Sequence, residues 1–358
     1  MKCATKQSLD ASSSLPQLHW TKEQAGSSST QDSFRLVSGE EKASIELIQG
    51  DNLKALRLLA QTQANTFTFA YLDPPYLTGR EFFHEPRSRS KSGKADAKKL
   101  KAFDDRWKSM GEYLDHLEPR LRAVRELLTE NGSMVLHVDS KTVHYAKVLC
   151  DQIFGIESFA SEVIWRYRRW PSKTPNFQRV HDVMIRYVKN SETRPRFHQL
   201  YEPLAPSTQA TWGTKKQRAV TNDDGKRLRS STGNENSLGT PLGDVWDISI
   251  VAPVAKERTG YPTQKPEALL KRWLEACTAA GDKVLDPYMG SGTTLKVAAE
   301  LDRKAVGIDA GPAALNVAME RLHDAKIDHR HYCIDSGKKA EQQHKQQAAQ
   351  PLSMGAAG

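Results

Sequence analysis

The chain has 358 residues, which is enough for one large domain or for one domain with an inserted module. Its formal net charge of +9 favours a polyanionic partner, and a basic protein without such a partner is the alternative. The four cysteines have no paired spacing, which argues for a reducing compartment. The amino terminus lacks the apolar core of a signal peptide, and no run of about eighteen apolar residues predicts a membrane span.

The first part of the chain predicts an arm followed by two strands. Residues 1–40 are rich in Ser, Gln and Lys and predict a flexible amino-terminal arm. Residues 45–59, IELIQGDNLKALRLL, predict a strand, a glycine turn and a helix, and residues 66–72 predict a second strand that ends at Asp73. The polar and basic residues 87–101 predict a mobile loop near this strand end, with a merely solvated loop as the alternative.

The middle of the chain predicts a helix, three strands and a segment of different character. Residues 110–132 predict a helix that ends at its terminal Asn-Gly pair. Strands are expected at 133–139, 163–170 and 181–190. Residues 191–243 are rich in Thr, Ser, Asn, Gly and Arg with little periodicity, which indicates an inserted module rather than core.

Order returns towards the carboxyl end. Residues 265–281 predict a helix, and residues 283–309 predict a strand, a turn, a helix and a second strand. Residues 336–358 have few apolar side chains and predict a disordered tail. The alternation of strands and helices predicts an α/β fold with a mostly parallel sheet, divided into a catalytic half, 41–190, and a cofactor-binding half, 244–335.

A glycine-rich turn, DPYMGSGTT, follows the strand that ends at Asp286. Gly290 and Gly292 allow a tight turn and close approach of a ligand, a helix begins near Thr293, and the next strand ends at Asp309. Ligands of open α/β sheets bind beyond the carboxyl ends of strands. An acid at the second strand end can accept hydrogen bonds from both hydroxyl groups of a ribose, so the unit predicts an adenosine-type cofactor.

The charge of this turn favours S-adenosylmethionine over a nucleotide. No Lys follows Gly292, as a phosphate-binding loop requires, and Leu295 stands where the dinucleotide fingerprint has its third glycine. Asp286 before the glycines would repel a pyrophosphate but would attract an ammonium or a sulfonium group. A purely structural turn between strand and helix is the alternative.

The other informative segment is Asp73-Pro74-Pro75-Tyr76. Because proline cannot donate to a sheet ladder, the two prolines end the strand and fix the turn. The exocyclic amine of adenine or cytosine is a poor nucleophile, and the Asp73 carboxylate with the Pro74 carbonyl could accept its two hydrogens and localise its lone pair. A flipped-out base could stack on Tyr76, which stabilises such a base by about 1–3 kcal/mol. A surface β-turn is the alternative.

These segments together resemble the amino-methyltransferases of DNA in their circularly permuted beta arrangement. The DPPY sequence at 73–76 matches the catalytic motif of that family, DPYMGSGTT at 286–294 matches its cofactor loop, and GYPTQKPEALL at 260–270 matches the segment before that loop. The catalytic motif comes first and the cofactor motif last, as in the beta arrangement. The similarity covers roughly residues 45–322, apart from 191–243.

The resemblance implies a Rossmann-like, seven-stranded, mixed and mostly parallel sheet of the S-adenosylmethionine-dependent type, with 191–243 as a target-recognition module. It implies that Thr263, Gln264 and Lys265 close the methionine end of the cofactor and that Asp51 lies near its adenine, with a helix N-cap as the alternative for Asp51. The cofactor residues so predicted are Asp51, Thr263, Gln264, Lys265, Asp286, Pro287, Gly290, Ser291, Gly292, Thr293 and Asp309. One departure is Leu77, since the family commonly has Asn after the tyrosine.

Two basic stretches are expected to contact double-stranded DNA. They are WRYRRW at 165–170, with Arg166, Arg168 and Arg169, and TKKQR at 214–218, with Lys215, Lys216 and Arg218. In a strand, Trp165 and Tyr167 share one face, so core packing is the alternative for the aromatic rings. The loop at 87–101 is expected to close over DNA by the same logic.

The sequence is compatible with several functions. The sequence favours methylation of adenine N6 in DNA, with cytosine-N4 methylation, a catalytically silent DNA-binding subunit and an RNA substrate as alternatives. Carbon-5 methylation is rejected because no cysteine follows a proline, and residues 116–118 carry only the first half of a zinc deaminase signature. Residues 329–333, HRHYC, lack a second ligand cluster, so no metal is expected. A homodimer is common in the family, and the expected location is the cytoplasm of a bacterial or phage-infected cell, at the nucleoid.

Overall fold

The computed structural model describes residues 32–40, 42–84, 100–173, 175–218, 220–226 and 231–335. The predicted tail, most of the predicted loop at 87–101 and residues 1–31 of the predicted arm lie outside the described residues. The boundary of the arm at residue 40 is wrong, because strand β1 (Ser33–Gly39) pairs antiparallel with β16 (His329–Asp335). The ring of Phe34 lies 6.4 Å from that of Tyr332. Composition could not reveal this strand, since the free edge of β16 supplies its partner.

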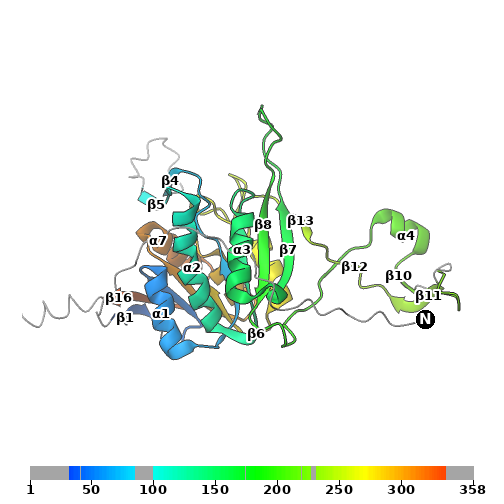
Figure 1. Ribbon diagram of the computed structural model, residues 1–358, viewed down its shortest axis with the longest axis horizontal. Helices are drawn as coiled ribbons and strands as arrows, with labels where there is room; N and C mark the ends of the chain where they lie inside the picture. The colour runs from blue at the N-terminus through cyan, green and yellow to red at the C-terminus, as the bar shows by residue number, and fades with distance from the viewer. Residues whose placement is uncertain are drawn as a thin grey trace, which may run out of the picture.

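A mixed sheet forms the centre of the molecule (Figure 1). Its strand order is β1, β16, β2 (Ile45–Gln49), β15 (Lys304–Asp309), β14 (Lys283–Asp286), β3 (Phe67–Leu72), β6 (Leu128–Val138), β8 (His181–Val188), β7 (Phe159–Arg166) and β13 (Val245–Asp247). Pairing is parallel from β16 to β6 and between β7 and β13, whereas β8 is antiparallel to both of its neighbours. The predicted α/β, mostly parallel sheet is confirmed. It has ten strands rather than seven, because β1 and β16 extend one edge and β13 extends the other.

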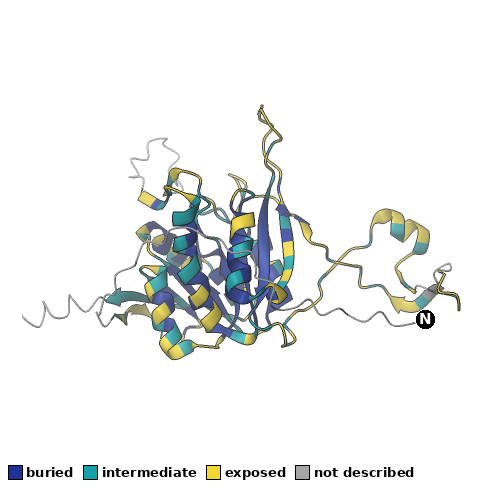
Figure 2. Ribbon diagram, viewed as in Figure 1, coloured by how far each residue is buried: buried dark blue, intermediate teal, exposed yellow. Residues whose placement is uncertain are grey.

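Helices cover both faces of the sheet (Figure 1). One face carries α1 (Asn52–Gln63), α2 (Met110–Leu127), α3 (Val143–Phe154) and the 3₁₀ turn Ile156–Ser158, and the other carries α5 (Glu267–Cys277), α6 (Thr293–Glu300) and α7 (Pro312–Asp324). The central strands are therefore buried on both faces (Figure 2), which explains why β3 reads as the continuous apolar run FTFAYL. None of the described helices is long and apolar enough to cross a membrane.

The helix predicted to reach Gly132 ends earlier. Helix α2 stops at Leu127 and β6 begins at the next residue. Gly132 lies inside β6, beside a shift in its register with β3, and a Cβ atom there would lie 2.9 Å from the carbonyl oxygen of Thr68. The glycine is therefore required by the close approach of the neighbouring strand and not by a helix end.

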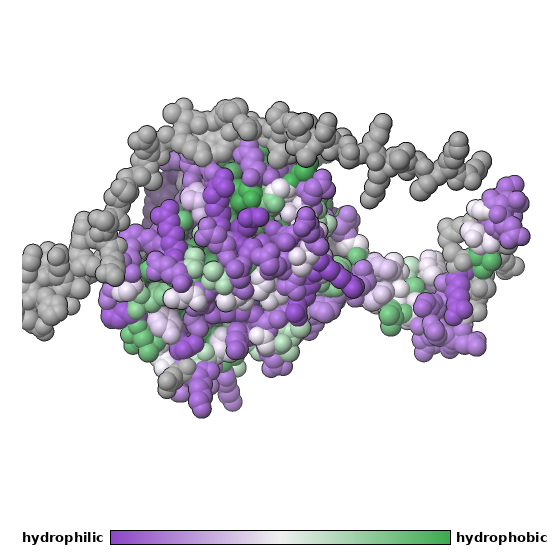
Figure 3. Space-filling view, turned by 60° about the horizontal axis from the view of Figure 1, so that its bottom comes forward, coloured by the Kyte–Doolittle hydropathy of each residue, from purple (hydrophilic) through white to green (hydrophobic). Residues whose placement is uncertain are grey.

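The segment 191–243 forms only short elements in its described residues. Strand β9 (Tyr201–Glu202) pairs with β12 (Thr240–Pro241), α4 (Pro206–Trp212) buries no residue, and β10 (Lys215–Arg218) pairs with β11 (Ser231–Asn236). Helix α4 and strands β10 and β11 project away from the sheet (Figure 1), and their surface is largely hydrophilic (Figure 3).

Strand pairing brings the two predicted motifs together. Strand β14 lies beside β3 and parallel to it, with Val284 paired to Phe69 and Leu285 to Ala70. Both strands therefore end at the same edge of the sheet, where Asp73 follows β3 and Asp286 ends β14. The two-stranded ribbon of β4 (Arg80–His84) and β5 (Leu100–Asp105) rises from the same edge, at the top of Figure 1.

Candidate active site

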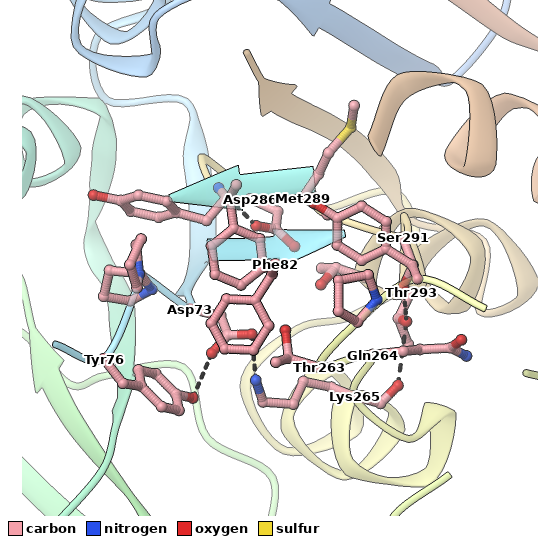
Figure 4. A pocket seen from close by; sticks show the side chains of 18 of the residues that line it. Asp73, Tyr76, Phe82, Thr263, Gln264, Lys265, Asp286, Met289, Ser291 and Thr293 are labelled. Carbon is pink, nitrogen blue, oxygen red and sulfur yellow. Dashed lines mark hydrogen bonds and ion pairs between the residues drawn. The ribbon is translucent and has the colours of Figure 1, made fainter. Parts of the chain in front are cut away.

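A pocket opens at this edge, with about 770 Å³ of empty space counted out to its mouth (Figure 4). It is lined from four parts of the chain: the turn after β3, the β4–β5 ribbon, the segment before α5 and the turn after β14. Eleven of the fifteen residues predicted for catalysis or cofactor binding line it, namely Asp73, Pro74, Pro75, Tyr76, Thr263, Gln264, Lys265, Asp286, Gly290, Ser291 and Thr293. The other four, Asp51, Pro287, Gly292 and Asp309, do not.

Asp73 lies between Tyr76 and Lys265 (Figure 4). The Tyr76 hydroxyl donates to Asp73 Oδ1 over 2.5 Å, and the Lys265 ammonium donates to Oδ2, also over 2.5 Å. Lys265 Nζ lies 5.1 Å from the centre of the Tyr76 ring, within cation–π distance. Burial and the neighbouring Asp73 carboxylate raise the pKa of Tyr76 well above its usual value, so the phenol keeps its proton and acts as a donor.

A buried carboxylate that the sequence analysis missed fixes the turn after Tyr76. Asp105, 1 % exposed, accepts hydrogen bonds from the backbone N–H groups of Leu77 and Thr78, at 2.8 and 2.9 Å, and from the indole of Trp107 at 3.1 Å. Leu77 has a φ of 59°, a left-handed conformation that Asn adopts more readily than Leu. Leu77, which stands where the family commonly has Asn, is therefore in a strained backbone conformation. The hydrogen bonds to Asp105 help to hold it in that conformation.

The turn after β14 is acidic and buried. Asp286, 3 % exposed, accepts a hydrogen bond from the Tyr288 N–H at 3.0 Å. Burial raises the pKa of Asp286 to about 7, with smaller contributions from the Asp73 and Asp309 carboxylates. A carboxyl group whose charge is disfavoured in this way is stabilised by a nearby cation. The acidic group at this turn therefore fits a sulfonium or an amino group and does not fit the negatively charged pyrophosphate.

Asp309 supports the turn from behind the pocket. Its carboxylate accepts from the Gly290 N–H at 3.1 Å and from the Gly311 N–H at 2.8 Å, and burial raises its pKa to about 6. Gly290 lines the pocket with a φ of 47°. Gly292 does not line the pocket. A Cβ atom there would lie 2.8 Å from Cβ of Ala318, so this glycine permits the packing of α6 on α7.

Two further predicted cofactor residues have structural partners outside the pocket. The carboxylate of Asp51 accepts from the Lys54 N–H at 3.0 Å, as a helix N-cap, and forms an ion pair with Arg120 at 3.1 Å. The carbonyl of Pro287 accepts from the side chain of Asn52 at 2.9 Å. The N-cap alternative for Asp51 is therefore what the structure shows.

The segment before α5 closes the pocket opposite the glycine turn. Gln264 uses its amide to hold this segment together, since it accepts from Thr259 and donates to the Glu257 carbonyl at 2.7 Å. Thr263 has a φ of 58°, which again marks a constrained loop. Thr293 donates to the Lys265 carbonyl at 3.2 Å and so joins the segment to α6.

The aromatic and apolar wall of the pocket carried no motif in the sequence. Phe82 and Phe103 stack across the β4–β5 ribbon with ring centres 4.6 Å apart, and both line the pocket. Tyr261 and Met289 contribute from the other side. The only available signal was the position of Tyr261 and Met289 inside segments that already matched the family.

The predicted DNA contacts divide into two sets. Arg166 ends β7, and Arg168 and Arg169 follow it. All three are exposed, with Arg166 paired to Asp247, but Trp165 and Tyr167 are buried. Core packing is therefore correct for these two rings, which cannot stack on bases. Lys215, Lys216 and Arg218 lie on β10 in the projecting segment, and the structure does not bring the two sets together. In the part of the chain that the structure describes, no cluster of His, Cys, Asp or Glu could hold a metal ion.

A mostly parallel α/β sheet that sets a proline-fixed carboxylate against an acidic glycine turn defines an S-adenosylmethionine-dependent methyltransferase. More narrowly, the chain belongs to the DNA methylase family, whose sequence model matches residues 67–320. It is 26% identical to the type II methyltransferase M.HpaI of Haemophilus parainfluenzae over 268 residues, 75% of this chain and 72% of that protein. It is 26% identical to the DNA adenine methyltransferase YhdJ of Escherichia coli K12 over 289 residues, 77% of this chain and 82% of that protein. Among solved structures, the cytosine-N4-specific PvuII DNA methyltransferase shares the fold, with a TM-score of 0.51, 15% identity and coverage of 80% and 90% of the two chains.

Proposed function

We propose that the protein transfers a methyl group from S-adenosylmethionine to the exocyclic N6 of an adenine flipped out of double-stranded DNA, at a specific sequence. We further propose that it has the circularly permuted beta arrangement, with DPPY at 73–76 as its catalytic motif. The observation that carries the proposal is the meeting of Asp73 and Tyr76 with the acidic turn at Asp286 in one pocket. The similarity to an adenine-specific relative supports adenine as the target base.

Asp73 and Pro74 would hold the amine. Both oxygens of the Asp73 carboxylate already accept hydrogen bonds, from Tyr76 and from Lys265. To accept an amine hydrogen, Asp73 exchanges one of these bonds, and the Lys265 side chain is the more adaptable partner because it has four rotatable bonds. Localising the amine lone pair prepares the nitrogen for in-line attack, and when bound the cofactor supplies an electrophilic methyl group on sulfur.

The neighbouring aromatic residues would hold the base. Tyr76 offers a ring at the mouth of the turn, and the ring of His137 lies 5.8 Å behind it. The stacked rings of Phe82 and Phe103 form an apolar wall that excludes water from the reacting atoms. Stacking of this kind offsets part of the free energy of extruding a base.

The division of labour along the chain is part of the same proposal. Residues 41–190 form the catalytic half, 244–335 the cofactor-binding half, and 191–243 a module that reads the target sequence. The hydrophilic surface of this module and the cations of β10 support a role on DNA. Two of the relatives, the EcoP15I Mod subunit of Escherichia coli and the StyLTI Mod subunit of Salmonella typhimurium, are type III restriction–modification enzymes by name. We therefore place the protein in the cytoplasm, acting on DNA at the nucleoid.

Nucleoside mass spectrometry tests the proposal directly. Unmethylated DNA is incubated with S-adenosylmethionine and either the wild-type protein, Asp73→Ala or the control Asp104→Ala, whose carboxylate forms surface ion pairs and does not line the pocket. N6-methyladenine is expected with the wild type and the control and not with Asp73→Ala. N4-methylcytosine would overturn the choice of base, and no methyl mark despite cofactor binding by calorimetry would overturn catalysis on DNA.

A further inference from the structure

A hairpin extension rises from the edge of the sheet that carries the pocket (Figure 1). Strands β7 and β8 pair up to Arg166 and His181, and the chain between them continues as two arms, of which 167–173 and 175–180 are described. The Tyr167 N–H donates to the Val180 carbonyl at 2.9 Å, and the Gln178 side chain donates to the Trp170 carbonyl at 2.7 Å. The two arms are therefore tied together well beyond the end of the sheet.

The hairpin exposes two large aromatic rings. Trp170 is 92 % exposed and Phe177 is 96 % exposed, one on each arm. Rings of this size normally bury their surface, so nearly complete exposure on a projecting ribbon indicates a surface that meets a partner.

The charge of the hairpin identifies the partner as a polyanion. Residues 166–180 include five cations, Arg166, Arg168, Arg169, Lys173 and Arg179, and no acidic residue. The ion pairs of Arg166 with Asp247 and of Arg179 with Asp139 join the hairpin to the body of the protein. Exposed aromatic rings flanked by cations are the combination that binds nucleic acid through base stacking and phosphate contact.

The base of the hairpin is anchored next to the catalytic turn. The Tyr167 hydroxyl donates to buried Asp182 at 3.0 Å, and the ring of Tyr167 packs 4.9 Å from that of Trp165. Trp165 packs 5.5 Å from His137, which in turn contacts Tyr76. A short series of buried rings thus fixes the hairpin relative to the proposed base-stacking residue.

We propose that the hairpin enters the DNA duplex beside the pocket and places Trp170 and Phe177 in the base stack that the flipped adenine leaves. This inference rests on the proposed function. Trp170 lies three residues beyond Tyr167, and Phe177 lies three residues before Val180. At roughly 3.3 Å per residue each ring can therefore stand about 10 Å beyond the base of the hairpin, which matches the groove depth of about 8 Å in B-DNA. Apolar side chains inserted between base steps stabilise an unstacked duplex, and the cations hold the phosphates on either side.

The test compares two DNA substrates. The target sequence is first found by sequencing plasmid DNA that the wild-type protein has methylated. One duplex then carries the target adenine correctly paired, and a second carries the same adenine opposite a mismatched base, which lowers the free energy of extrusion. The value of kcat/KM is measured for wild type, Trp170→Ala, Phe177→Ala and the double variant, with Tyr145→Ala as a control because Tyr145 is 46 % exposed on α3.

For the paired duplex, each single variant is expected to lose roughly tenfold in kcat/KM and the double variant about 100-fold, in line with the stacking energy of one base. For the mismatched duplex the loss should stay below about threefold, and Tyr145→Ala should match the wild type on both. Equal losses on the two duplexes, or no loss on either, would overturn the insertion of the rings. If the wild type methylates neither duplex, the proposed function itself is overturned, and this inference with it.

Discussion

The buried carboxyl group of Asp286 should make the protein less stable as the pH rises. Its folded-state pKa is raised to about 7, from a usual value of 3.8, mainly by burial. The folded state therefore keeps a proton that the unfolded state releases between about pH 4 and pH 7, and the free energy of unfolding falls across this range. Asp286→Asn preserves the shape and the acceptor for the Tyr288 N–H but cannot ionise.

The size of the effect follows from the difference between the two pKa values. About three pKa units correspond to about 4 kcal/mol at pH 8, where the folded-state group is also ionised. At pH 5 the same calculation gives about 1.5 kcal/mol. The asparagine variant should therefore exceed the wild type in free energy of unfolding by at most these amounts, with the difference increasing by roughly 2–3 kcal/mol from pH 5 to pH 8.

Urea unfolding followed by circular dichroism at pH 5, 6, 7 and 8, without added cofactor, measures this difference. Asp324→Asn is the control, because the Asp324 side chain is 74% exposed at the end of α7, and it should show no such pH dependence. The reasoning is refuted if Asp286→Asn is no more stable than the wild type at pH 8, or if its gain is the same at pH 5 and pH 8. A stabilised variant with weakened cofactor binding would show that the site trades stability for function.

Three further predictions concern loops and glycines. Asp105→Ala should lower the free energy of unfolding in urea by about 2–4 kcal/mol and methylation rates by more than tenfold, because the N–H groups of Leu77 and Thr78 lose their buried acceptor. The neighbouring variant Asp104→Ala, which removes only surface ion pairs, should change stability by less than about 1 kcal/mol. Gly292→Ala should lower the free energy of unfolding by about 2–3 kcal/mol, because Gly292 has a φ of 71° and the added methyl group would meet Ala318. Adding Ala318→Gly should recover part of that loss, and strictly additive effects of the two substitutions would contradict the contact. Lys326→Gly should raise the free energy of unfolding by about 0.5–1 kcal/mol, because this exposed residue has a φ of 57° just past α7; an unchanged urea midpoint would count against that explanation.

The sequence predicted the parts of the site that depend on local chemistry. Two prolines after an acid and two glycines after another acid have few structural explanations, so Asp73 and Asp286 could be assigned before any spatial information. Their meeting in one pocket followed from the general rule that parallel strands end at the same edge. The pairing of β3 with β14 satisfies that rule here.

What the sequence could not predict depends on distant backbone and side-chain partners. Asp105 is one of two adjacent aspartates, and only the three-dimensional contact with the turn at Leu77 distinguishes it from its half-buried neighbour Asp104. Gly132 and Gly292 were interpreted as local turn residues, although both are fixed by close contacts with another element. Strand β1 needed the edge of β16, which lies at the other end of the chain.

The strand order also has a consequence for biosynthesis. Strands β2 and β3 are consecutive in the chain, yet β15 and β14 lie between them in the sheet. The amino-terminal half therefore emerges from the ribosome with a gap two strands wide, and β3 has an unpaired hydrophobic edge until roughly 200 more residues have been made. At about 5–20 residues per second this takes roughly 10–40 s. During that interval the unpaired edge of β3 is a surface to which a chaperone or another nascent chain can bind, and a protein truncated before β14 would keep that edge exposed.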